Sequence, residues 1–268
     1  MKRGAAAAFA AFAALVILLP AAGASGGSAA IQSLADAEPQ PSLEPVTSPP
    51  PDTSSAEAAY NRGIEYLNNG AYQKAIAEFD ASLAIAPDNV EVLLERAIAY
   101  DSLGNTARAI EDYDRVIALD DRNFTAYANR ARDYAMQHKM ELAVADLTKA
   151  IELQPENMEL RLQRAGAYYM LDQLERAIED INPVLAANPQ DAHLHAARAF
   201  FYFRLKKFVP ALDDINLALT IDPNQAGFYY LRSQIRHQMG DHVGGNQDIA
   251  KAIKLDPSIL KKAMDFFP

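Results

Sequence analysis

The chain has 268 residues, a formal net charge of −10 and no cysteine. The acidic balance argues against nucleic-acid binding, because contacts with phosphate need clustered Lys and Arg. The lack of cysteine excludes disulfides, thiolate nucleophiles and cysteine-based metal sites.

The first 24 residues have the features of a secretory signal peptide. Lys2 and Arg3 form a basic start, residues 5–19 form an apolar run, and Pro20 ends it. The small residues Ala22-Gly23-Ala24 then fit a cleavage site. We expect residues 1–24 to be removed after Ala24 and the protein to be periplasmic or secreted. The apolar run is short for a membrane span, so we expect membrane attachment only if this segment stays uncleaved.

Residues 25–55 have the composition of a disordered linker. Six prolines, many Ser and Ala residues and several acids leave no apolar period there. Such a composition cannot bury a core. We interpret the segment as a spacer, with a docking peptide around Pro49-Pro50-Pro51 as the alternative.

From Ala56 onward the sequence repeats itself every 34 residues. Six consecutive units cover residues 56–89, 90–123, 124–157, 158–191, 192–225 and 226–259. Each unit reads as two short helices joined by a turn, as at Leu103-Gly104-Asn105 in the second unit. One helical hairpin cannot bury its apolar face alone, so neighbouring hairpins must stack into a continuous core.

Three columns of the repeat explain how such hairpins would pack. Position 8 holds a small residue in every unit: Gly63, Ala97, Ala131, Ala165, Ala199 and Ser233. Position 20 is also small: Ala75, Ala109, Ala143, Ala177, Ala211 and Gly245. Small residues allow two helices to approach closely. Position 32 holds proline in every unit except the second, and proline ends the second helix.

These columns resemble the tetratricopeptide repeat family over residues 56–259, although the family's usual Trp at position 4 is missing. The resemblance implies an all-α fold, a right-handed superhelical solenoid of antiparallel helix pairs. It also implies that the first helices line a concave face that binds a protein or peptide.

Two further columns carry opposite charges. Position 7 is always arginine: Arg62, Arg96, Arg130, Arg164, Arg198 and Arg232. Position 23 is always acidic: Glu78, Asp112, Asp146, Asp180, Asp214 and Asp248. We predict a structural ladder of ion pairs, one within each hairpin, since the Arg stem packs on apolar neighbours while its planar head pairs with a carboxylate. The alternative is that the Arg heads reach a carboxylate of a ligand.

The resemblance also implies which positions of the first helices touch a ligand. The candidate groove residues at these positions are Tyr60, Ile64, Leu94, Ile98, Arg132, Met136, Tyr169, Met170, Phe200, Phe203 and Arg204. Aromatic and Met side chains on a concave surface suit an apolar peptide groove. The alternative is that several of them pack into adjacent helices as core.

Two features concern the later units. Pro183 lies inside the second helix of the fourth unit and removes a hydrogen bond to Glu179, which predicts a kink. Residues 260–268 contain Leu260, Phe266 and Phe267 and are expected to form a short cap on the last unit. Exposed aromatic residues there would alternatively support a homodimer.

No catalytic, cofactor-binding or metal-binding motif emerges from the sequence. The five His lack metal-site spacing, and neither a phosphate-binding loop nor a nucleophile elbow occurs. We therefore expect no enzyme and no cofactor, and a scaffold or adaptor that binds a protein or peptide in the cell envelope. The alternatives are a structural subunit of an export or surface-assembly complex and an accessory module of an envelope enzyme.

Overall fold

The computed structural model describes residues 56–260, which contain twelve helices. The first helices of the hairpins are α2 (Ala56–Asn68), α4 (Val90–Ser102), α6 (Phe124–Met136), α8 (Met158–Met170), α10 (Ala192–Arg204) and α12 (Ala226–Gln238). The second helices are α3 (Tyr72–Ile85), α5 (Thr106–Leu119), α7 (Met140–Leu153), α9 (Leu174–Ala187), α11 (Phe208–Ile221) and α13 (His242–Leu255). Each helix starts 34 residues after its counterpart. The signal peptide, the linker and most of the cap lie outside the described residues.

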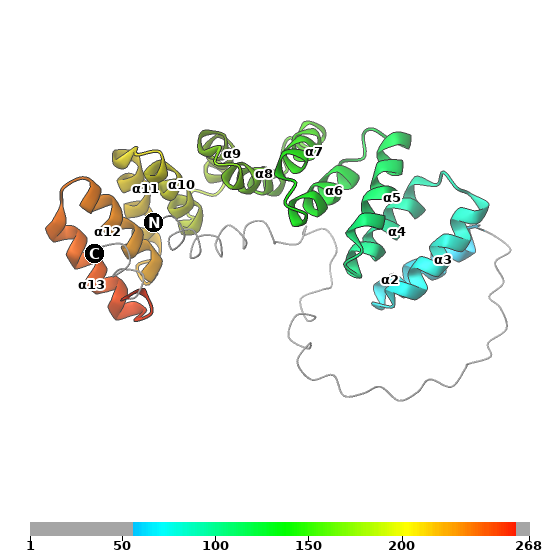
Figure 1. Ribbon diagram of the computed structural model, residues 1–268, viewed down its shortest axis with the longest axis horizontal. Coiled ribbons are helices and arrows are strands. Elements are labelled where there is room, and N and C mark those ends of the chain that lie inside the picture. The colour runs from blue at the N-terminus through cyan, green and yellow to red at the C-terminus, as the bar shows by residue number, and fades with distance from the viewer. Residues whose placement is uncertain (1–55, 261–268) are drawn as a thin grey trace, which may run out of the picture. The chain divides into compact units, whose positions relative to one another are not determined.

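The described residues divide into two compact units, 56–133 and 134–260, whose boundary falls within α6. In the first unit, α2 packs on α3, α3 on α4 and α4 on α5. In the second unit, neighbouring helices pack in chain order from α7 to α13. Figure 1 shows these antiparallel pairs following one another. The all-helical fold of helix pairs is thus confirmed, and the superhelical path of the whole array stays a prediction.

Side-chain caps begin several of the helices. The Asn89 and Asn157 side chains each accept hydrogen bonds from two backbone N–H groups at the starts of α4 and α8. Asp191 and Asp241 each accept one at α10 and α13. These contacts satisfy backbone donors that have no partner within the helix.

The turn inside each hairpin needs a left-handed residue. Position 15 has a positive φ in every unit: Gly70, Gly104, His138, Asp172, Lys206 and Gly240. The three residues that are not glycine have φ values of 59°, 58° and 58°. Glycine adopts this conformation without steric cost, so the other three turns are strained. The strain places the turns of the middle hairpins among the weaker parts of the fold.

The small residues of positions 8 and 20 lie buried where the two helices of a hairpin meet. Around them, each of the two compact units has its own hydrophobic core. In the first compact unit, the fully buried side chains include Phe79, Leu93 and Tyr113. Gly63 makes one of the closest of these approaches. A Cβ atom at this position would lie within 2.4 Å of Cε1 of Phe79.

We expect Gly63→Ala to destabilise the protein by about 1–3 kcal/mol, because the methyl group would displace the buried Phe79 ring. Urea denaturation measures this effect. Gly227→Ala is the matched control: it is also a helical glycine, but nothing lies within 4 Å of its Cβ position. The control should be neutral or stabilising by up to about 1 kcal/mol. Equal stabilities for the two variants would contradict the packing argument.

Proline 183 does not interrupt its helix. The helix α9 runs from Leu174 to Ala187 with Pro183 inside it. Its backbone nitrogen has no hydrogen to donate to Glu179, so one helical hydrogen bond is missing. The kink at this point stays a prediction. Among residues 56–260, no helix has the length and apolar character needed to cross a membrane.

Candidate functional site

The Arg and acid columns form ion pairs within the hairpins. In four of them, Nε and Nη2 of the Arg donate to the two carboxylate oxygens of the Asp at 2.6–2.8 Å: Arg96–Asp112, Arg164–Asp180, Arg198–Asp214 and Arg232–Asp248. In the first hairpin, Arg62 pairs with Glu78 at 2.9 Å. The sixth predicted pair is Arg130–Asp146. Arg130 lies in the compact unit 56–133 and Asp146 in the compact unit 134–260, so this pair stays a prediction. Such bidentate, charge-assisted pairs are stronger than single hydrogen bonds.

Each later Arg also reaches the preceding hairpin through Nη1. Its acceptor is a side-chain oxygen at position 25 of the preceding unit, as in Arg96–Asp80 at 2.6 Å, Arg130–Asp114 at 2.6 Å, Arg164–Thr148 at 3.0 Å, Arg198–Asn182 at 2.8 Å and Arg232–Asn216 at 2.9 Å. One guanidinium thus connects a first helix with two second helices. This fixes the register of stacked hairpins as well as the geometry of each one.

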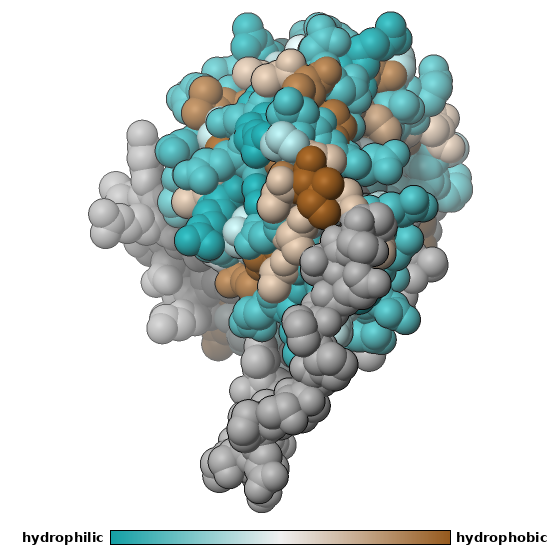
Figure 2. Space-filling model, turned by 90° about the vertical axis from the view of Figure 1, so that its right-hand side faces the viewer, coloured by the Kyte–Doolittle hydropathy of each residue, from teal (hydrophilic) through white to brown (hydrophobic). Residues whose placement is uncertain are grey.

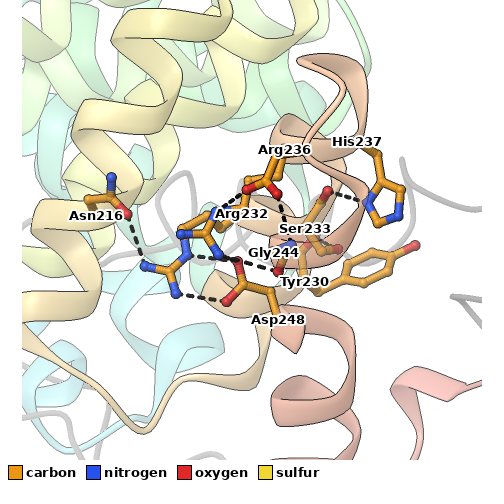
Figure 3. A network of polar contacts seen from close by, with 9 residues as sticks. Asn216, Tyr230, Arg232, Ser233, Arg236, His237, Gly244 and Asp248 are labelled. Atoms are coloured by element: carbon orange, nitrogen blue, oxygen red, sulfur yellow. Dashed lines mark hydrogen bonds and ion pairs between the residues drawn. The ribbon is translucent and has the colours of Figure 1, made fainter. Parts of the chain in front are cut away.

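The last hairpin carries a modified form of this arrangement. Figure 3 shows Arg232 between Asn216 and Asp248, with Arg236 also bound to Asp248. Arg236 stands where the first five units have Tyr. Its Nη1 donates to Asp248 at 2.9 Å and to the backbone oxygen of Gly244 at 3.3 Å. The two arginines thus hold the start of α13 against α12.

The ladder arginines are engaged by the protein itself. Hydrogen bonds with Asp180 and Asp214 raise the pKa values of Arg164 and Arg198, which keeps both guanidinium groups charged. Their acid partners are almost fully buried. This geometry favours the structural role over the alternative, in which the Arg heads bind a ligand.

The candidate groove residues of α8 and α10 come together in one cluster. Tyr169 contacts Phe200 with a ring distance of 5.9 Å, and Arg204 lies 5.9 Å from the centre of the Phe200 ring. Arg204 Nη2 donates to Asp172 at 2.7 Å. We call Tyr169, Phe200 and Arg204, together with Met170, which follows Tyr169 in α8, the α8–α10 cluster. Burial raises the pKa of Tyr169, which keeps its hydroxyl neutral.

The members of this cluster differ in exposure. Met170 is 49% exposed, and Arg204 is also exposed. Phe200 is only 6% exposed, so its assignment to an open groove is corrected: the ring packs against Tyr169 and Phe201 in the core. Phe203 is half-buried beside Phe208. Met170, Arg204 and the outer edge of Tyr169 are left to face a partner.

The candidate residues at the start of the array are less open. Tyr60, Ile64 and Leu94 are half-buried against the core of the first unit, and Ile98 is half-buried as well. They form an apolar surface that still offers edges to a ligand. The next two candidates differ: Met136, at the end of α6, is 58% exposed, and Arg132 is bound to a neighbouring acid at 2.9 Å.

The first unit carries negative charge near this surface. Burial, and then the neighbouring Glu91, raise the pKa of Glu95. Burial, Glu95 and Glu91 together raise the pKa of Tyr60. Figure 2 views the side on which α2 and α3 lie, and its described surface is mainly hydrophilic with scattered hydrophobic residues. In the part of the chain that is described, no group of three or more His, Cys, Asp or Glu is placed to hold a metal ion.

Comparisons with known proteins agree with this architecture. The family model described as "Tetratricopeptide repeat" matches residues 66–131 and 134–200. The structure is similar to that of YrrB, described as a TPR protein with an unusual peptide-binding site, with a TM-score of 0.61, 19% identity, and coverage of 67% of this chain and 92% of YrrB.

Two other solved structures are also similar. The C-terminal part of a TPR repeat-containing protein from Cytophaga hutchinsonii has a TM-score of 0.63 at 15% identity, over 73% of this chain and 78% of that one. The pilF protein of Pseudomonas aeruginosa has a TM-score of 0.55 at 19% identity, over 76% and 93%. At these identities the likeness concerns the fold alone. No curated protein matches the sequence.

Proposed function

We propose that this chain, which contains tetratricopeptide repeats in residues 66–131 and 134–200, is an adaptor that binds an extended peptide or a helix of a partner protein on its first helices. Tetratricopeptide repeat proteins generally mediate contacts between proteins. YrrB, with a similar fold, is described as having a peptide-binding site. In this reading the chain is a scaffold and not an enzyme.

The observation that carries the proposal is the α8–α10 cluster. The exposed Met170 follows Tyr169 at the end of α8, and Tyr169 and Arg204 both contact the ring of Phe200 on α10. Met and aromatic side chains supply apolar contact area, whereas Arg204 already donates to Asp172 of this chain. The cluster therefore suits an apolar side chain of a partner segment.

We further propose that binding takes place in the cell envelope. The support is the signal-like composition of residues 1–24, with cleavage after Ala24, and the linker of residues 25–55.

Site-specific photocrosslinking in the source cell tests the adaptor proposal. A photoreactive residue at Met170 should capture one defined partner, whereas the same residue at Val209, on the second helix α11 and 63% exposed, should not. With that partner purified, Met170→Asp should weaken binding at least tenfold, because a carboxylate would replace an apolar contact. Val209→Asp is the matched control and should leave binding unchanged.

The same experiment separates the alternative function. A structural subunit held by its ends would give crosslinks from Val243 in α13, which is exposed together with Leu260. Capture from Val243 with none from Met170 would favour the assembly subunit and contradict the adaptor. The homodimer through the C-terminal end would appear there as a crosslink between two copies of this chain.

A further inference from the structure

Asp133 is a buried acid in a column of the repeat whose other acid, Glu65 of the first unit, is exposed. Position 10 holds Ala99, Ala167, Phe201 and Ile235 in four of the other units, and all four are buried. Asp133 is only 1% exposed, yet within residues 56–260 it forms no ion pair that would offset the loss of hydration. Burying an ionised carboxylate without a partner is costly, so the group must be neutral or compensated.

The neighbouring acid is Asp101, on α4. The Tyr113 hydroxyl, from α5, donates to Asp101 Oδ2 at 2.7 Å, and Arg132 Nη2, from α6, lies 2.9 Å from the same oxygen. Two donors on one oxygen identify Asp101 as the ionised member of the pair. Arg132 then balances the charge of Asp101 and leaves nothing to balance a second carboxylate.

The contact between the two acids requires a proton. Asp101 lies close enough to Asp133 for its charge and a side-chain hydrogen bond to raise the pKa of Asp133. Two ionised carboxylates are acceptors only, so one of them must carry the hydrogen. Two of the four carboxylate oxygens, Asp101 Oδ1 and Asp133 Oδ2, are buried and have no hydrogen-bond partner within residues 56–260. An unpaired carbonyl oxygen of a neutral carboxyl group costs far less than an unpaired anionic oxygen.

We propose that Asp101 and Asp133 share one proton at neutral pH and act as a pH-sensitive joint between α4 and α6. With the proton present, the buried charges are one carboxylate and one guanidinium. Loss of the proton leaves an additional negative charge between the two helices, and the packing of α6 against α4 and α5 is weakened. Arg132 is also a candidate ligand contact, so the same step changes the charge of the first-helix surface.

The direction of the pH effect follows from the environment of Asp133. Burial, and then the charge and hydrogen bond of Asp101, raise the pKa of Asp133 to about 8, while Arg132 opposes this shift. In an unfolded chain the pKa of Asp is about 3.9. Between these values the folded state binds more protons than the unfolded state, so stability decreases as pH rises from about 4 to about 8.

Asp133→Asn tests the proposal, since the amide mimics the protonated acid in shape and in its ability to donate. The ratio of the unfolding constants of the wild-type chain and this variant should rise with pH, by up to tenfold per unit within this window. The control is Asp121→Asn, which removes an exposed charge and should give a ratio that stays constant. A ratio for Asp133→Asn that is independent of pH would overturn the proposal.

A second measurement covers the case in which the variant does not fold. The side-chain carboxyl carbon of Asp133 in the wild-type chain can be followed by NMR as a function of pH. We expect its titration midpoint well above the ordinary pKa of Asp, which is about 3.9. A midpoint near the ordinary value for Asp would show that Asp133 is ionised in the folded protein, and the shared proton would then be excluded.

Discussion

Arg164→Ala is expected to destabilise the protein by about 3 kcal/mol or more. The substitution leaves Asp180 buried without its two charge-assisted hydrogen bonds, which are 2.8 and 2.6 Å long. It also breaks the contact of Arg164 with Thr148, which connects α8 to the preceding helix α7. The loss should appear as a lower midpoint of urea denaturation with an unchanged slope.

Two comparison variants give this prediction its physical meaning. Arg122→Ala removes an exposed Arg and should change stability by no more than about 0.5 kcal/mol. Replacing both partners with apolar residues, Arg164→Met with Asp180→Leu, should restore most of the lost stability, because no buried charge is then left unpaired. If the double variant is as unstable as Arg164→Ala, the cost comes from lost packing and not from an unpaired carboxylate.

The sequence predicted the parts of the ladder whose chemistry is the same in every unit. Arg at position 7 and an acid at position 23 recur six times, so their pairing could be inferred from the helical period. The contact with position 25 was missed, since that column reads Asp80, Asp114, Thr148, Asn182 and Asn216. These residues differ in type and share only a side-chain oxygen that can accept a hydrogen bond. That shared property can be recognised only once the stacking of the hairpins is known.

The groove residues show where the periodicity loses its predictive power. Helical spacing places Phe200 and Met170 on the surfaces of the first helices, but it does not say how closely the next helix covers them. In the structure Phe200 packs against Tyr169 and becomes core, whereas Met170 stays open. Asp133 was missed for a related reason: the same column holds the exposed Glu65 in the first unit, so an acid there carries no signal until its burial beside Asp101 is known.

Stacked hairpins contact only their neighbours, and this determines which helices lose stability when one hairpin is disrupted. The helix α3 packs against α2 and α4, and α2 packs against α3 and α4. In such an array the stability is a sum of local terms and neighbour terms. The hairpin of α2 and α3 has a neighbour on one side only within residues 56–260, so it should open independently of more distant hairpins.

Phe79→Ala is expected to remove about 3–5 kcal/mol from this hairpin. The ring is fully buried, lies against Gly63 and is 6.2 Å from the ring of Tyr60. Alanine would leave a cavity where α2 and α3 meet. Hydrogen exchange should therefore show loss of protection in α2 and α3, with α12 and α13 unchanged.

The control is Ile215→Ala, a fully buried residue of α11 with hairpins packed on both sides. Its cavity costs about 2–5 kcal/mol, but the loss is shared with the neighbouring helices α10 and α12 because both contact α11. Protection should then fall across several hairpins of the second unit. A uniform decrease over residues 56–260 in the Phe79→Ala protein would contradict nearest-neighbour coupling, since it would require the first hairpin to unfold together with the whole array.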